Sequence, residues 1–363
     1  MKRLWLYISV CFIVLFGTQV LAQDALDPQV SDMLQAVLDD AVTAGNPGAV
    51  MWIDSPMGNF EGASGTADVD AGIVLQPDDS FRIGSITKTL TATIILQLVE
   101  ENVLTLDDLL ARWLPETAAT LPYGDQMTLR QLLNHTAGVA DYEVPVTPSL
   151  ADPETRHRQW LPEEVVAFVA DHEASFAPGE AFSYSSTGYI LLGMVVEAAT
   201  GKTLVENYHQ RILDPLDMRH TYLSDYEEPT STLVRGYSNI LSSDDYNASV
   251  AGSAGGLVSN GPDMVTFFRA LMTGQLFNDA ATLQTMLTTY EQAILPGGTA
   301  YALGIMQTPT PIGDAYGNRG QIFGFQALSF YFPDYDIVLV AMVNADEMYV
   351  NLGSVLEILT ELV

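Results

Sequence analysis

The stretch Phe81-Arg82-Ile83-Gly84-Ser85-Ile86-Thr87-Lys88-Thr89-Leu90 opens a predicted helix over 85–101 and places a lysine three residues after a serine. Three residues make nearly one helical turn, so the Ser85 hydroxyl and the Lys88 amine share one face. A serine becomes a nucleophile when a base lies beside it, and a desolvated lysine can be that base or can tune it. The helix N-terminus also supplies free N–H groups that suit an oxyanion. The stretch therefore predicts a nucleophilic serine.

A plainer interpretation of the same residues is a serine N-cap followed by a solvated lysine. Lysine is scarce in this chain, because only Lys88 and Lys202 follow residue 22. The helix is also apolar over much of its circumference, and a lysine on such a helix costs free energy unless it is paired or used. The apolar residues are Ile86, Leu90, Ile94, Ile95 and Leu98. On this stretch alone, both interpretations stay open.

The first 22 residues have the pattern of a secretory signal peptide. Lys2 and Arg3 precede an apolar run over 4–16, and Val20-Leu21-Ala22 is a small-residue cleavage site before Gln23. The run is short for a membrane span, although an uncleaved anchor is the alternative. We therefore expect an exported protein, periplasmic or extracellular, with no stable membrane insertion after the signal is cleaved.

The mature domain over 23–363 would be acidic and free of cysteine. The full chain of 363 residues carries a net charge of −31, which becomes −33 when Lys2 and Arg3 are removed. Such a surface repels nucleic acid and anionic lipid, so we expect neither as a partner. The one cysteine, Cys11, lies in the apolar run, so the mature fold must depend on its core rather than on disulfides. The length is ample for one large domain, and the oligomeric state stays open.

Predicted strands lie near both ends of the chain, and predicted helices lie between them. The simplest architecture is an α+β fold in which one antiparallel sheet is built from both ends of the chain. Terminal helices flank this sheet, and a mostly helical region over about 101–225 is inserted. Ser85 would lie at the seam between the sheet and that region, where pockets are common. The predicted strands are 49–53, 62–67, 81–83, 302–306, 314–317, 326–332 and 337–344, and the predicted helices include 27–45, 128–134, 161–171, 187–200, 262–272 and 348–362.

Two segments are predicted to lack regular structure. Residues 145–153 are expected to form a loop, and residues 225–249 are expected to form a polar excursion near the site. Tyr184 is expected in a loop just ahead of the helix over 187–200. Beside a lysine ammonium its phenolate form would be favoured, so Tyr184 could take the proton of Ser85. The alternative is a buried tyrosine that forms a hydrogen bond at a helix start.

Ser85-Ile86-Thr87-Lys88 is followed by Pro178-Gly179-Glu180 and then by Tyr184-Ser185-Ser186. This ordered set resembles the serine beta-lactamase-related family, which contains class C beta-lactamases, D-alanyl-D-alanine carboxypeptidases, D-aminopeptidases and esterases. The resemblance implies a beta-lactamase/transpeptidase-like fold. It continues over nearly all of the mature chain, through Leu132-Leu133-Asn134-His135-Thr136-Ala137-Gly138, Ser253-Ala254-Gly255-Gly256-Leu257, Tyr301-Ala302-Leu303-Gly304 and residues 324–344.

The resemblance also implies roles for single residues. Ser85 would be the acylated nucleophile, and Lys88 and Tyr184 would form the base system. The backbone N–H groups of Ser85 and of a residue on the strand after Gly320 would form the oxyanion hole.

The sequence departs from the family at two of the implied substrate-binding positions, which are Ser186, Asn318, Arg319, Gly320 and Gln321. Ser186 stands where the family usually has an asparagine, and Asn318 stands where it usually has a lysine or a histidine. Arg319 is adjacent, but neighbours on a strand point to opposite faces, so it could replace that cation only at a bulge. These departures favour an esterase or an unusual peptidase.

We therefore expect an exported serine hydrolase that forms an acyl-enzyme at Ser85 on a small ester, amide or D-amino-acid peptide. One alternative is a true beta-lactamase, and another is a degenerate member of the fold that binds a peptide or a partner without turnover. No cofactor and no metal are expected, because the five histidines show no metal-ligand spacing and there is no phosphate-binding glycine loop. There is also no G-x-S-x-G motif of the α/β-hydrolase type.

Overall fold

The computed structural model of the protein describes residues 25–241, 245–295 and 298–362, so the predicted signal peptide and Cys11 lie outside it. Its main feature is an eight-stranded sheet with the order β3-β2-β1-β11-β10-β9-β8-β7. Neighbouring strands pair antiparallel, and β1 pairs directly with β11, so the two ends of the chain build one sheet as predicted. The strands are β1 (Gly48–Ser55), β2 (Gly58–Asp68), β3 (Ile73–Val74), β7 (Ala300–Tyr301), β8 (Met306–Thr310), β9 (Gly313–Ile322), β10 (Phe325–Phe332) and β11 (Ile337–Val343).

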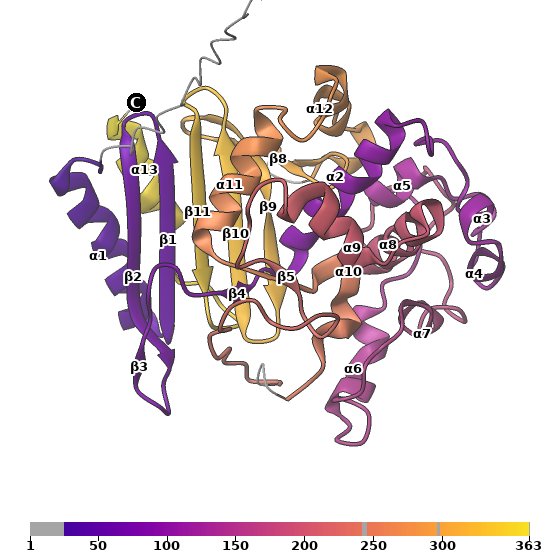
Figure 1. The fold of residues 1–363 in the computed structure, drawn as a ribbon, viewed down its shortest axis with the longest axis horizontal. Helices are drawn as coiled ribbons and strands as arrows, with labels where there is room; N and C mark the ends of the chain where they lie inside the picture. The colour runs from indigo at the N-terminus through magenta and orange to yellow at the C-terminus, as the bar shows by residue number, and fades with distance from the viewer. Residues whose placement is uncertain (1–24, 242–244, 296–297, 363) are drawn as a thin grey trace, which may run out of the picture.

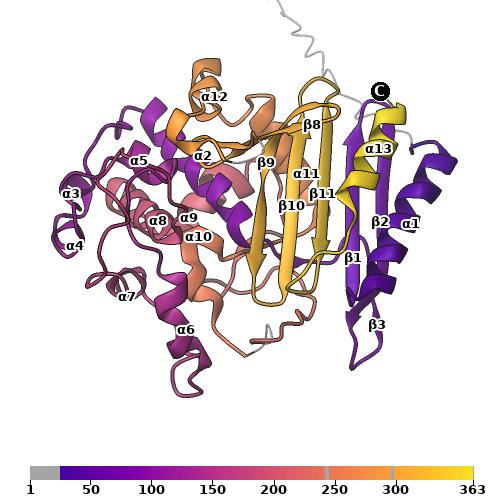
Figure 2. The ribbon, with the colours of Figure 1, turned by 180° about the vertical axis from the view of Figure 1, so that it is seen from behind.

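Helices cover both faces of this sheet (Figure 1). The terminal helices α1 (Pro28–Ala44) and α13 (Leu352–Leu362) pack on one face, where Leu34, Leu38 and Leu359 are buried against the strands. Helix α11 (Gly261–Met272) lies on the other face, in front of the strands in Figure 1 and behind them in Figure 2. The flanking terminal helices thus confirm the predicted architecture.

A helical region lies beside the β9 edge of the sheet (Figure 2). Its central helices are α2 (Thr87–Glu100) and α8 (Ser186–Thr200), both buried over most of their length. Gly201 ends α8 in the left-handed conformation, with φ 68°, which glycine adopts without strain. The other helices there are α3 (Leu110–Trp113), α4 (Pro115–Ala119), α5 (Leu129–Leu133), α6 (Glu143–Ala151), α7 (Pro162–Ala167), α9 (Leu204–Tyr208), α10 (Gly252–Gly255) and α12 (Ala280–Met286).

A second, smaller sheet leads into the site. Its order is β4 (Phe81–Arg82), β6 (Leu257–Ser259) and β5 (Tyr222–Leu223), and β6 pairs antiparallel with both neighbours. The chain leaves β4 and turns at once into α2, which fixes the start of that helix at the seam between the main sheet and the helical region. Within the part of the chain that the structure describes, no single helix has the length and hydrophobicity of a membrane span, although the bent pair Ser186–Thr200 and Leu204–Leu213 meets both criteria.

Two predictions of local structure were wrong. Residues 145–153 were expected as a loop because of their prolines, but α6 runs through them: Pro145 lies in its first turn, and Pro148 lies inside the helix. Residues 302–306 were expected as a strand, but 302–305 form the turn between β7 and β8, and only Met306 lies in a strand. Gly304 has φ 79° there, and a Cβ on it would lie 2.3 Å from the Cβ of Ala92, so this turn packs tightly on α2.

Candidate active site

Ser85 lies in a single 3₁₀ turn (Gly84–Ile86) that joins β4 to α2, so its backbone stands at the helix N-terminus. Strand β9 runs against this turn at close range. A Cβ on Gly84 would lie 2.7 Å from the Gln321 nitrogen, and a Cβ on Gly320 would lie 1.8 Å from the Ile83 oxygen. Only glycine fits at these two places, because any side chain would push the strand away from the turn. The close approach brings the backbone of Gln321 beside that of Ser85.

The Lys88 side chain is fully buried beneath this turn. Its Nζ donates hydrogen bonds to Ser85 Oγ at 3.0 Å, to Ser186 Oγ at 3.1 Å and to the Ala254 carbonyl at 2.8 Å. Burial lowers the pKa of Lys88 below 10.5, although the charge of Glu143 opposes this shift. A lysine in this setting can lose its proton and then accept one from the Ser85 hydroxyl.

Ser186 links Lys88 to a carboxylate that sequence reasoning missed. Its hydroxyl accepts from Lys88 and donates to Glu143 Oε1 at 2.6 Å. Glu143 is the first residue of α6, the helix that was predicted as a loop. The sequence held no local signal for it, because it is one of 45 acidic residues and no motif marks its position.

Tyr184 lies in the loop ahead of α8, as predicted, and keeps 36% of its side chain exposed at the mouth of the site. Its ring centroid lies 4.9 Å from Lys88 Nζ and 4.3 Å from that of His135. Burial raises the pKa of the Tyr184 phenol, and hydrogen bonding to Ser85 only partly offsets it. This direction runs against the predicted preference for a phenolate and favours the protonated phenol.

The His135 ring packs against the Tyr184 ring. Its imidazole is buried among the rings of Phe182, Tyr184, Tyr189 and Tyr301, and its Nδ1 accepts from the Ser185 backbone N–H at 3.2 Å. Burial lowers the pKa of His135 well below 6.5, so the ring is neutral. A neutral ring in this position packs against Tyr184 without adding charge to the site.

Ser85 stands between two hollows. The first, of about 460 Å³, has mostly apolar walls that include Val146, Tyr246 and Phe323, with Glu143 at its edge. It also takes in Ile240 from the 225–249 excursion, which confirms that this segment lies near the site. The second hollow, of about 420 Å³, lies on the other side of the turn and contains a single cation among its lining residues, Arg319, together with Tyr184, Gln321, Gln326 and Met348. A substrate bound across Ser85 can place one part in each hollow.

The predicted substrate-binding residues divide into two groups. Ser186, Arg319, Gly320 and Gln321 line one or both hollows. Asn318 does not: it is 2% exposed, and its Nδ2 donates to Thr89 Oγ1 at 3.3 Å, so the structure buries it beneath the site. The register of β9 against β10 is regular here, and Arg319 points to the face opposite Asn318 as strand geometry requires.

Comparisons with known proteins agree with this geometry. The chain matches the family described as Beta-lactamase over residues 33–355. A D-stereospecific amidohydrolase from Streptomyces sp. is 34% identical with a TM-score of 0.80, and the match covers 90% of this chain and 97% of that one. The D-amino acid amidase of Ochrobactrum anthropi SV3, complexed with L-phenylalanine amide, is 29% identical with a TM-score of 0.81, over 92% and 99% of the two chains.

Curated relatives give shorter matches. Esterase EstB of Burkholderia gladioli is 34% identical over 167 residues, which are 44% of this chain and 42% of the esterase. The chain spans about half the length of the first curated relatives that it matches. By their names these relatives include hydrolases of esters and amides. Because the family match spans most of the sequence and the fold agrees over nine tenths of it, the chain belongs to the Beta-lactamase family, the serine beta-lactamase-related proteins.

Proposed function

We propose that this protein is an exported serine hydrolase that forms an acyl-enzyme at Ser85. One observation carries the proposal: a fully buried lysine, with its pKa lowered, lies 3.0 Å from a serine hydroxyl at a helix N-terminus. A lysine that served only the fold would be expected to have a carboxylate partner, and among the described residues Lys88 donates hydrogen bonds only to hydroxyl and carbonyl oxygens and forms no ion pair.

In the first step, neutral Lys88 takes the proton of Ser85 while Oγ bonds to the carbonyl carbon of the substrate. The negative charge that forms on the carbonyl oxygen is held by the backbone N–H groups of Ser85 and Gln321. The carbon–oxygen or carbon–nitrogen bond to the leaving group then breaks, and the leaving atom receives a proton from the protonated Tyr184 phenol, which Lys88 replenishes. Water attacks the ester at Ser85 by the same sequence in reverse.

The two hollows suggest how the substrate lies. The larger, mostly apolar hollow suits the acyl part, and the hollow with Arg319 suits the leaving group. Small esters and amides fit this arrangement, and the D-amino acid amidase and D-stereospecific amidohydrolase among the structural relatives favour D-amino-acid derivatives.

A substrate panel tests the proposal. It contains p-nitrophenyl esters, D- and L-amino-acid amides and a chromogenic cephalosporin, each assayed with the wild type and with Ser85→Ala. We expect turnover of an ester or amide that Ser85→Ala loses. Turnover of the cephalosporin at a comparable rate would indicate a true beta-lactamase, and binding without turnover of any compound would indicate a binding protein.

Export is a separate part of the proposal, supported by the pattern of the first 22 residues. Expression of the full sequence in a Gram-negative host, followed by fractionation and intact mass, tests it. A periplasmic product that begins at Gln23 is expected. A product that keeps Met1, whether in the cytoplasm or in the membrane, would contradict cleavage and release.

A further inference from the structure

Arg82 is a buried cation that the proposed chemistry does not use. It is the last residue of β4, three residues before Ser85, and only 6% of it is exposed. Its partner across the small sheet is Val258, which also pairs with Tyr222, so β6 holds the Arg82 backbone on one side. The position connects Arg82 directly to the turn that carries the nucleophile.

The Arg82 guanidinium lies over an aromatic ring and forms no ion pair among the described residues, although Asp225, Glu227 and Glu228 line the same hollow as Arg82. Its Cζ is 4.9 Å from the centroid of Tyr246, and Nε and Nη1 are buried without a hydrogen-bond partner in the described structure. The nearby Asp225 carboxylate accepts instead from the Ala248 backbone N–H at 2.7 Å. Arg269, by contrast, holds both Asp54 and Asp336. A buried guanidinium without such partners costs stability, so the presence of an arginine at this position needs another explanation.

The Tyr246 ring beneath Arg82 forms part of the wall of the larger hollow, which in the proposed function holds the acyl part of the substrate. Tyr246 meets Phe323 edge-on, with centroids 5.5 Å apart, and both residues line the hollow next to Ser85. Tyr246 belongs to the excursion over 225–249, which has little regular structure of its own. Arg82 therefore connects an irregular segment to a strand that ends at the nucleophile turn.

We propose that Arg82 is a positioning residue that fixes the Tyr246–Phe323 wall relative to Ser85 and so sets which acyl groups the hollow accepts. A cation over a desolvated aromatic ring attracts it more strongly than an apolar side chain would, and the planar guanidinium stacks where an ammonium cannot. Large acyl groups reach the wall and depend on its position, whereas an acetyl group does not. The inference rests on the proposed hydrolase function.

The test compares p-nitrophenyl acetate with p-nitrophenyl octanoate in Arg82→Met, Arg82→Lys and Arg219→Met. Arg219 is an exposed arginine paired with Asp217, so it serves as the matched control. We expect Arg82→Met to lower kcat/KM for the octanoate about tenfold, mainly through KM, with the acetate and the control unchanged within about twofold. Arg82→Lys should recover little, because the ammonium does not stack.

An equal loss of kcat/KM on both esters would mean that Arg82 only supports the nucleophile turn. No loss on either ester would mean that the Tyr246–Phe323 wall keeps its position without Arg82. Each result overturns the proposal. Tyr246→Leu should reproduce the octanoate defect, and the double variant should be no worse than either single one. Binding of the octanoate to proteins that also carry Ser85→Ala, measured by calorimetry, repeats the comparison without turnover. A wild type that hydrolyses neither ester would therefore count against the hydrolase function, while the binding data would still decide the role of Arg82.

Discussion

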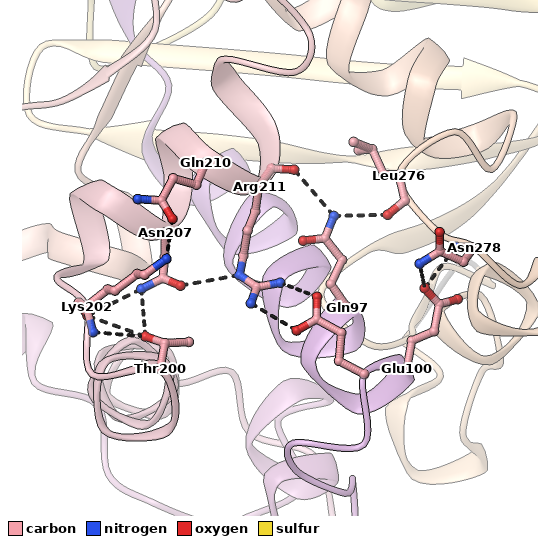
Figure 3. Close-up of polar contacts among 10 residues, drawn as sticks. Gln97, Glu100, Thr200, Lys202, Asn207, Gln210, Arg211, Leu276 and Asn278 are labelled. Atoms are coloured by element: carbon pink, nitrogen blue, oxygen red, sulfur yellow. Dashed lines mark hydrogen bonds and ion pairs between the residues drawn. The ribbon is translucent and has the colours of Figure 1, made fainter.

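The polar side chains at the two ends of α2 have different kinds of partners. At the C-terminal end, Gln97 donates to the Leu276 carbonyl at 2.9 Å, and Glu100 accepts from the backbone N–H groups of Asn278 and Asp279 at 2.8 and 2.7 Å. Figure 3 shows part of this network. The Arg211 guanidinium donates there to Glu101, which directly follows α2, and to Asn207 of α9. The contacts there pair donors with acceptors, as is usual where polar groups stabilise a fold, although Gln97 Oε1 is buried without a partner among the described residues.

At the N-terminal end, a lysine is enclosed in the protein without a carboxylate in ion-pair contact among the described residues. Lys88 donates to two hydroxyl groups and one carbonyl, and burial lowers its pKa. An amine held in this way costs stability, but it becomes neutral, and so able to accept a proton, at a lower pH than a solvated lysine. The comparison teaches that one helix can carry a structural network at one end and a reactive pair at the other, and that the partners of the charged groups tell them apart.

Removal of the Lys88 amine should have the largest effect. Lys88→Met introduces an apolar side chain of similar length but removes the amine. Ser85 then lacks its proposed base, so we expect turnover to fall about 1,000-fold or more. Steady-state hydrolysis of the best ester measures it. The matched control is Lys202→Met, because Lys202 is exposed and its Nζ donates to Gln210 Oε1, far along the chain from Ser85. Equal losses in both variants would contradict the distinction between these lysines.

The pH profile should shift when the charge of Glu143 is removed. In the proposed mechanism the neutral form of Lys88 is the base, so labelling or turnover should be full above its lowered pKa and lost as the pH falls through it. Glu143 raises that pKa, so Glu143→Gln should move the acid limb of the profile to lower pH, with only a modest change in the plateau rate. A limb that stays in place or moves to higher pH would show that Glu143 does not act on Lys88.

A substitution at the C-terminal end of α2 should lower the stability of the fold and leave turnover unchanged. Arg211 holds Glu101 through two hydrogen bonds, at 2.7 and 3.0 Å, in a partly exposed ion pair. Arg211→Met should lower the free energy of unfolding by about 0.5–1 kcal/mol and leave turnover unchanged. Chemical denaturation, with Arg219→Met as an exposed reference, measures it. A loss of turnover at unchanged stability would contradict the assignment of this end to the fold.

The sequence allowed the sheet, its flanking helices and the Ser85–Lys88 pair to be predicted, because each rests on local periodicity or spacing. Residues three apart at a helix start must share a face, and a short continuous apolar run such as that of β11 is typical of a fully buried strand. The position of Tyr184 ahead of α8 was also predictable, because Ser185-Ser186 marks a helix start.

The remaining features depend on contacts between distant segments. Glu143 reaches the site because α6 forms despite Pro148, and no local pattern signals that outcome. The protonation of Tyr184 depends on how fully its neighbours exclude water, and the burial of Asn318 depends on how β9 packs on α2. Tertiary packing determines all three, so local sequence patterns could not.

The most direct test of the central claim is the intact mass of the protein after reaction with a small fluorophosphonate. The account predicts one adduct on the wild type, none on Ser85→Ala, a strongly slowed reaction in Lys88→Met, and full labelling of Ser354→Ala, whose serine lies on α13 and lines neither hollow. Folded wild-type protein that takes up no adduct, or an adduct that persists in Ser85→Ala, would contradict the claim that Lys88 activates Ser85.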